Sequence, residues 1–213
     1  MATIRHIAER RGTALYEPVF DLDTSWVVGV EALSPQVSDG TDAVHAAVAA
    51  LSSLPSRTFV SVRLAPRSLG RLLSLLEGHS LDRVVLHLDQ PAIELRMLGA
   101  TIADFRDRGG RLALDVGAGP VALRRVAELE PDLIELATSV SRGIDTDRSR
   151  RAAAIALVAL GEQTGGRVEA QGISTAGELA TLRGMGVAYG RGPILAEPFP
   201  LTELFPDVPP DAA

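Results

Sequence analysis

The sequence alternates short apolar runs rich in β-branched residues with longer stretches in which apolar residues recur at helical spacing. The short runs predict strands, because β-branched side chains favour extended backbone. The longer stretches predict helices that cover a sheet. This alternation is typical of βα units around a parallel sheet and predicts an α/β fold. The runs predicted to form strands are 59–64, 84–88, 111–115, 133–136 and 167–170.

Local signals mark where several helices begin and end. Thr175, followed three residues later by Glu178, matches the capping box that opens a helix. Gly109 and Gly165 each stand at the end of a predicted helix, where a left-handed C-cap is wanted. The clearest loop is 34–41. Helices are predicted over 41–54, 149–163 and 175–185.

Length and composition limit the class of protein. A chain of 213 residues with 46% hydrophobic residues suits a single domain over 1–213, with a frayed tail at 206–213. The formal net charge of -6 gives no support for nucleic-acid binding, and the lack of cysteine excludes disulfides and thiolate metal sites. We find no signal peptide and no run of apolar residues long enough to span a membrane. We therefore expect a cytoplasmic protein without membrane insertion.

Several motifs occur in the order of one known family. Glu31-Ala32-Leu33 follows two strand-like segments, and later motifs are centred on Glu135, Gln171 and Arg191. From about residue 14 to residue 200 the chain resembles the EAL family of cyclic di-GMP phosphodiesterases. The resemblance implies a modified TIM (β/α)8 barrel of the EAL type whose first strand is antiparallel to the rest. The short connection between Glu31 and Arg63 implies a shortened first helix region.

The resemblance also implies a metal-dependent reaction. Hydrolysis in this family needs divalent cations held by several oxygen ligands at the C-terminal ends of the strands. Glu31 matches the first ligand, and Asp115 is what remains of a pair of aspartates. Glu135 stands where the family has a lysine. The other departures at metal-binding, base and substrate positions are Pro35, Arg63, His87, Ala137, Gln171, Arg191 and Glu197.

These departures predict that the chain is not an enzyme and has no catalytic residue, no metal and no cofactor. Arg63 places a cation where a metal ion would bind, and its guanidinium would neutralise Glu31 and Asp115. A metal held by His87 with Asp89 and Asp115 is the alternative for this part of the pocket. The residues predicted to form a vestigial pocket are Glu31, Arg63, His87, Asp115, Glu135 and Gln171.

Three functions fit this reading of the sequence. The first is a catalytically inactive regulatory or scaffolding module in bacterial signalling, which binds a protein partner that the sequence does not identify. The second is a receptor that binds cyclic di-GMP or another anionic nucleotide without metal, through Arg63 and Arg191. The third is a residual phosphodiesterase. By analogy with the family, the apolar segment 152–160 favours a homodimer.

Overall fold

The computed structural model describes residues 14–33, 41–64, 73–74, 76–88, 99–117 and 120–204. Its eight strands follow one another in chain order in a closed barrel. Strand β1 (Leu15–Asp21) pairs antiparallel with β8 (Tyr189–Gly190). The pairs β2–β3, β3–β4, β5–β6, β6–β7 and β7–β8 are all parallel. The predicted (β/α)8 barrel with an antiparallel first strand is therefore confirmed.

The chain divides into two compact units, which we describe one at a time. The first unit comprises Met1–Pro18, Val28–Arg111 and Pro198–Ala213. The second unit comprises Val19–Val27 and Leu112–Glu197.

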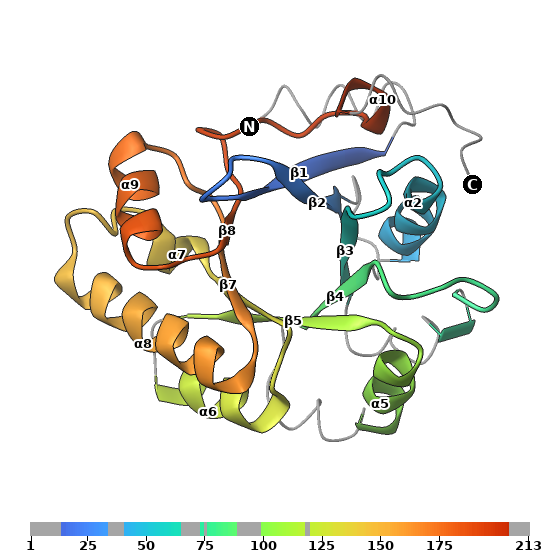
Figure 1. Ribbon diagram of the computed structural model, residues 1–213, viewed down its shortest axis with the longest axis horizontal. Helices are drawn as coiled ribbons and strands as arrows, with labels where there is room; N and C mark the ends of the chain where they lie inside the picture. The colour runs from blue at the N-terminus through green and yellow to red at the C-terminus, as the bar shows by residue number, and fades with distance from the viewer. Residues whose placement is uncertain are drawn as a thin grey trace. The chain divides into compact units, whose positions relative to one another are not determined.

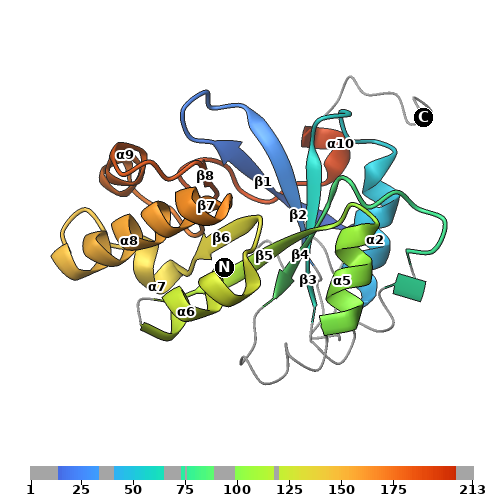
Figure 2. The same cartoon turned by 60° about the horizontal axis from the view of Figure 1, so that its bottom comes forward.

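In the first unit, helices α2 (Thr41–Leu51) and α5 (Gly99–Asp107) accompany strands β2 (Val27–Leu33), β3 (Phe59–Leu64) and β4 (Val84–Leu88) (Figure 2). Every residue of β4 is buried, as expected for a strand of a parallel sheet. Gly29 is required beside β3, because a Cβ atom at this position would lie 2.3 Å from the Phe59 ring. The guanidinium of Arg111 lies 5.2 Å from the centre of the same ring.

The predicted helix over 41–54 is too long at its C-terminal end. Helix α2 ends at Leu51, and the side chain of Arg83 donates to the carbonyl oxygens of Leu51, Leu54 and Pro55. Since these carbonyl groups already have a donor from a distant part of the chain, the segment gains little by continuing the helix. The sequence of the helix alone carries no sign of this contact.

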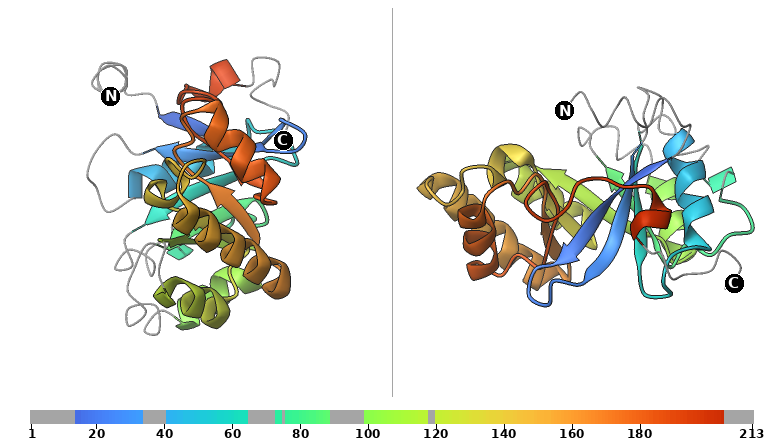
Figure 3. Two further views of the ribbon diagram at one scale, coloured as in Figure 1. Left: turned by 90° about the vertical axis from the view of Figure 1, so that its left-hand side faces the viewer. Right: turned by 90° about the horizontal axis from the view of Figure 1, so that it is seen from above.

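In the second unit, the strands are β5 (Arg111–Val116), β6 (Leu133–Leu136), β7 (Arg167–Ala170) and β8 (Figure 1). Helix α8 (Arg148–Thr164) packs against α6 (Pro120–Leu129) and β7 (Figure 3). The short helix α7 (Thr138–Ser141) follows β6, and α9 (Ala176–Gly184) follows β7. All four residues of β6 are buried.

Helix boundaries in the second unit agree with the sequence signals. The capping box at the start of α9 is present, with Thr175 and Glu178 each bonded to the backbone of the other. The side chain of Asp147 accepts hydrogen bonds from the N–H groups of Ser149 and Arg150 and opens α8. Helix α8 ends at Gly165 in the left-handed conformation, as predicted. These caps satisfy backbone groups that the helix itself leaves without partners.

Two further points concern the ends of the chain and the membrane. Helix α10 (Leu201–Leu204) comes just after Phe199, whose backbone exchanges two hydrogen bonds of 2.9 Å with Tyr16 of β1. The predicted frayed tail at 206–213 and nearly all of the predicted loop at 34–41 lie outside the described residues.

Among the helices that the structure describes, none has the length and apolar character that crossing a membrane requires.

Candidate functional site

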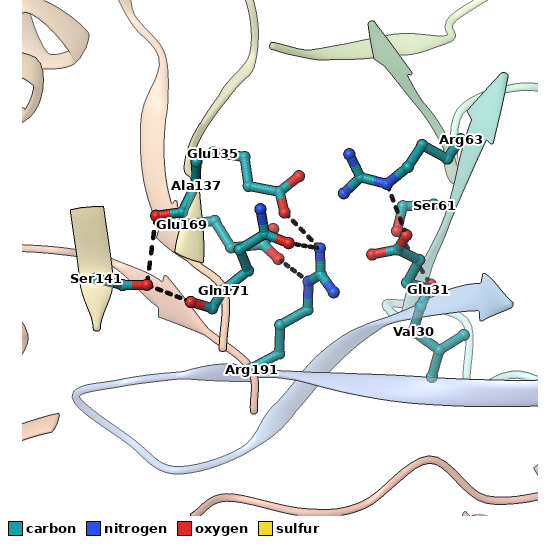
Figure 4. Close-up of polar contacts among 10 residues, drawn as sticks. All are labelled: Val30, Glu31, Ser61, Arg63, Glu135, Ala137, Ser141, Glu169, Gln171 and Arg191. Carbon is teal, nitrogen blue, oxygen red and sulfur yellow. Dashed lines mark hydrogen bonds and ion pairs between the residues drawn. The ribbon is translucent and has the colours of Figure 1, made fainter. Parts of the chain in front are cut away.

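Glu31 and Arg63 form an ion pair in the first unit. Glu31 lies on β2 with only 4% of its surface exposed, and Nε of Arg63 on β3 donates to its Oε1 at 3.1 Å (Figure 4). The register explains the contact, because Glu31 lies opposite Ser61 and Arg63 is two residues further along the same face of β3. Arg63 and Glu31 are therefore joined by an ion pair, whereas the predicted neutralisation of both Glu31 and Asp115 by Arg63 stays a prediction.

His87 is the next polar residue of this unit. It lies on β4, directly opposite Arg63 in the parallel register, and only 1% of its surface is exposed. Both residues stand near the C-terminal ends of their strands, where the sequence placed the pocket. An imidazole at this depth is inside the barrel sheet and is not a rim residue.

Asp115 and Glu135 are neighbours in the second unit. They lie opposite each other in the register of β5 and β6, and a carboxylate oxygen of each lies within 4.8 Å of one of the other. Glu135 is fully buried, whereas Asp115 is half-buried. Two carboxylates at this distance repel each other unless a cation or a proton is shared between them. The arrangement is therefore suited to holding positive charge.

Arg191 supplies one such positive charge. It directly follows β8, only 5% of its side chain is exposed, and its Nε donates to Oε1 of Glu169 at 2.9 Å. Its Nη2 donates to Glu135 and, at 3.4 Å, to Oε1 of Gln171 (Figure 4). Glu135 and Glu169 each have 1% or less of their surface exposed. One guanidinium thus joins the polar residues of β6, β7 and β8.

The backbone around Arg191 fixes its position. The carbonyl of Arg191 accepts a hydrogen bond of 3.1 Å from the N–H of Ile173. Gly192 follows with a φ of 142°, and a Cβ atom there would lie 2.3 Å from the backbone nitrogen of Ile173. Only glycine allows this close approach of the two segments. The glycine therefore helps to aim Arg191 at the carboxylates.

The segments that follow β6 and β7 are tied together beneath these side chains. The hydroxyl of Ser141 donates to the backbone carbonyl oxygens of Gln171 and Ala137 (Figure 4). Gln171 thus takes part through its backbone as well as its side chain. Ala137, where the family has an aspartate, contributes only its backbone here.

Glu178 is a second link between the two segments. It is 3% exposed, and its carboxylate accepts hydrogen bonds from the N–H groups of Gly143, Ser174 and Thr175 and from the hydroxyl of Ser174, at 2.7 to 3.1 Å. Burial by itself raises the pKa of Glu178, but these hydrogen bonds outweigh it and hold the pKa below its usual value. The carboxylate is therefore ionised and holds both segments in place.

Sequence reasoning missed Glu169, which is one of the two carboxylates bound by Arg191. A signal was available, because Glu169 and Gln171 are two residues apart and a strand places such residues on one face. A glutamate between Val168 and Ala170 in a short strand is also unusual, since buried carboxylates need a partner.

The ligand types present fit a divalent metal ion. In the second unit, Asp115 and Glu135 place their carboxylate oxygens close enough to share one ion. In the first unit, His87 and Glu31 are side chains of types that bind metal ions. Carboxylate oxygens together with an imidazole nitrogen suit Mn²⁺ and later first-row ions better than Mg²⁺, which prefers oxygen ligands alone. The donor set therefore differs from an all-oxygen site but still fits a metal.

A separate cleft of the first unit contains none of the predicted site residues. Among the described residues it is lined by Leu51, Ser52, Leu54, Ser56, His79, Ser80, Asp82 and Arg83. Asp82 and Arg83 come just before β4, so the cleft lies at the opposite end of that strand from His87. It adds nothing to the candidate site.

Comparisons with known proteins agree on the fold. The family model described as the EAL domain matches residues 42–198, which is more than half of the chain, whereas the comparison with curated proteins found no match. The EAL domain protein of Listeria monocytogenes EGD-e is 20% identical with a TM-score of 0.77, and the match covers 95% of each chain. The EAL domain of Mycobacterium smegmatis DcpA is 18% identical with a TM-score of 0.81, covering 92% of this chain and 96% of that one.

A third similar structure is the PaMucR phosphodiesterase, solved as a c-di-GMP complex. It is 17% identical with a TM-score of 0.79, and the match covers 95% of this chain and 98% of that one. At such identities the structural likeness shows the fold alone. The expected resemblance to the EAL family is nevertheless confirmed by the family model.

The prediction that the chain is not an enzyme is wrong. The EAL domain model matches most of the chain, and Asp115 and Glu135 of the second unit remain as neighbouring carboxylates that could hold a metal ion. The prediction failed because it scored each altered position singly, whereas ligands of a different type can serve the same metal. The role of each pocket residue, the use of Arg63 and Arg191 on a ligand, and a single domain over 1–213 stay predictions.

Proposed function

Since the chain belongs to the EAL domain family, we propose that it acts on cyclic di-GMP as a phosphodiesterase that depends on a divalent metal ion. The observation that carries the proposal is the pair of carboxylates in the second unit, Asp115 and Glu135, which lie close together near the C-terminal ends of β5 and β6. Active sites of this kind of barrel lie at that end. The likeness in fold to PaMucR, a phosphodiesterase solved with c-di-GMP, supports the choice of substrate.

The roles of the residues follow from their chemistry. A bound divalent ion would polarise the phosphate and lower the pKa of a water molecule. Asp115 and Glu135 would hold that ion, and Arg191 would orient Glu135 by donating to it. Arg63, whose side chain is 32% exposed, would bind an anionic phosphate oxygen of the substrate.

The test is the conversion of cyclic di-GMP to the linear dinucleotide, followed by chromatography in Mn²⁺, in Mg²⁺ and in chelator. We expect product with Mn²⁺ and none in chelator. Asp115→Asn should lower the rate at least about 100-fold, because loss of a supporting residue alone costs 10–100-fold. Asp82→Asn, a matched change in the cleft of the first unit, should leave the rate unchanged. Absence of product with either metal would overturn the proposal.

A second candidate is the receptor that binds an anionic nucleotide without metal. It is favoured by one observation, namely that Glu31 and Glu135 already have a guanidinium partner each. Isothermal titration with cyclic di-GMP separates the candidates, because the receptor should give the same heat of binding in chelator as in Mn²⁺. Heat of binding that appears only with the metal would exclude the receptor, and the phosphodiesterase would be the remaining candidate.

Other parts of the functional prediction remain proposals. They are a regulatory role through a protein partner, a cytoplasmic location and a homodimer. The family analogy supports the homodimer, and sedimentation equilibrium would test it directly.

A further inference from the structure

Three carboxylates form a row across neighbouring strands of the second unit. Asp115 of β5 lies opposite Glu135 of β6, and Glu135 in turn lies opposite Glu169 of β7. Side chains placed opposite one another in this way share a face of the sheet, and neighbouring strands are only about 4.8 Å apart. Carboxylates this close repel each other. The row therefore needs positive charge.

Burial makes this need stronger. Glu135 and Glu169 are buried, and Asp115 is half-buried. Repulsion between buried charges is screened much less than repulsion between charges in water. A cation inside the second unit therefore acts strongly on each member of the row.

Arg191 stands between two members of the row. Its Nε donates to Oε1 of Glu169 at 2.9 Å, and its Nη2 donates to Oε1 of Glu135 (Figure 4). The register explains this place, because Glu169 lies opposite Tyr189 and Arg191 is two residues further along. The backbone N–H of Arg191 also donates to the carbonyl of Ala170 at 3.0 Å. One guanidinium is thus divided between two carboxylates.

The charges of these four side chains do not balance. When all are ionised, three carboxylates face one guanidinium, and two negative charges are left over. One divalent ion carries the charge that is missing. Carboxylate oxygens of Asp115 and Glu135 lie within 4.8 Å of each other, so such an ion would bind between them. Glu135 is then the carboxylate that the ion and Arg191 have in common.

We propose that Arg191 lowers the affinity of the second unit for a divalent metal ion, and that Glu169 limits this effect by drawing the guanidinium away from Glu135. The cause is the repulsion between two cations at one carboxylate. Glu169 is a positioning residue, because it acts through Arg191. The inference rests on the proposed metal-dependent function.

The size of the effect follows from what one charge does to a neighbouring group. A charge within about 4–6 Å changes the affinity of a carboxylate for a proton about 10- to 1,000-fold. A divalent ion carries twice the charge of a proton. We therefore expect the guanidinium to change the affinity for Mn²⁺ at least about 10-fold.

The test is a titration of the metal-free full chain with Mn²⁺ alone, followed by the electron paramagnetic resonance signal of the free ion. Arg191→Gln removes the competing charge and should bind Mn²⁺ about 10-fold or more tightly than the wild type. A residue with a merely structural role would not give tighter binding when it is replaced. The matched control is Glu162→Gln, an exposed carboxylate of α8, which should have no effect.

Glu169→Gln tests the positioning role. Arg191 then pairs with Glu135 as its remaining carboxylate of the two, and the affinity for Mn²⁺ should fall about 10-fold or more. Glu169 also has a negative charge of its own, and the double variant separates the two effects. In the Arg191→Gln background, Glu169→Gln should change the affinity less than about threefold, because the residue through which it acts is gone. An equal loss in both backgrounds would overturn the positioning role.

Two further results would overturn the inference. One is equal affinity for Mn²⁺ in the wild type and Arg191→Gln, with circular dichroism showing that the variant is folded. The other is an unchanged affinity in Glu169→Gln, which decides the matter even where Arg191→Gln does not fold, because this variant keeps the pair of Arg191 with Glu135.

The proposed function fails in a different way. Affinities for Mn²⁺ that change as expected, without turnover of cyclic di-GMP, would support the inference and overturn the phosphodiesterase. Turnover with equal affinities in all variants would overturn the inference and support the phosphodiesterase. Absence of Mn²⁺ binding in every protein would overturn both.

Discussion

Removal of the Arg191 side chain should destabilise the protein more than any exposed charge substitution. Arg191→Ala leaves Glu135 and Glu169, which are 0% and 1% exposed, without the guanidinium that now donates to both. Breaking a buried ion pair by removing one partner costs about 3–5 kcal/mol. At about 2–4 °C per kcal/mol for a chain of this length, the melting temperature should fall by roughly 6–20 °C.

The measurement is thermal and urea unfolding of both proteins, followed by circular dichroism in chelator. The matched control is Arg124→Ala, because Arg124 pairs with Glu128 one turn along α6 and both side chains are largely exposed, at 73% and 43%. That change should leave the free energy of unfolding nearly unchanged, because an exposed ion pair contributes little to stability. Comparing the two variants separates the effect of losing a buried ion pair from the effect of removing any arginine.

A second substitution tests the cause. If the cost arises from uncompensated carboxylates, Glu169→Gln in the Arg191→Ala background should restore part of the stability, because it removes one buried charge. A loss below about 1 kcal/mol for Arg191→Ala would refute the reasoning, since it would show that the carboxylates have no need of the guanidinium. An equal loss of stability in the double variant would refute the charge explanation and would assign the loss to the packing of the Arg191 side chain.

Three further predictions concern single residues. Hydrogen bonds hold the pKa of Glu178 in the folded protein below its unfolded value of about 4.3. The carboxylate therefore stabilises the fold above the unfolded pKa, and this stabilisation is lost as the pH falls through the lower folded pKa. Glu178→Gln should accordingly make the melting temperature fall less steeply on acidification. Gly192→Ala should prevent folding or lower the melting temperature strongly, whereas Gly184→Ala, with no atom within 4 Å of the added Cβ, should be neutral in the same unfolding assay. Arg63→Ala should cost roughly 1–2 kcal/mol in chelator, because the buried Glu31 carboxylate loses its guanidinium partner, and addition of Mn²⁺ should restore the melting temperature; no response to Mn²⁺ would count against a metal at Glu31.

Much of the fold was predictable because it depends on local sequence. The buried strands of a parallel sheet read as short apolar runs, and the runs at 59–64, 84–88 and 167–170 coincide with β3, β4 and β7. The capping box of α9 was predictable for the same reason, since Thr175 and Glu178 are three residues apart. The end of α2 was not, because the residue that binds its last carbonyl groups is Arg83.

The candidate site was predictable as a list of positions but not as a set of charges. The ion pair of Arg63 with Glu31 followed from adjacent strands whose motifs were both visible. The network around Arg191 did not, because Arg191 follows β8 and Glu169 stands on β7 with no motif that pairs them, and Glu135 comes from a third strand.

This network changes how the altered positions should be weighed. When each position is considered by itself, Glu135 replaces the family's lysine, so that a cation is lost. In the same way, Arg191 replaces the family's glutamine, so that a side-chain amide is lost. In the structure the two changes meet, because Arg191 donates to Glu135 and thereby returns a cation to the same interior from the neighbouring end of β8. A change of sign at one strand end is thus compensated at another. The capacity of this barrel for chemistry depends on the charges that come together and not on the match at each position, which is why a count of substitutions wrongly predicted a chain without activity.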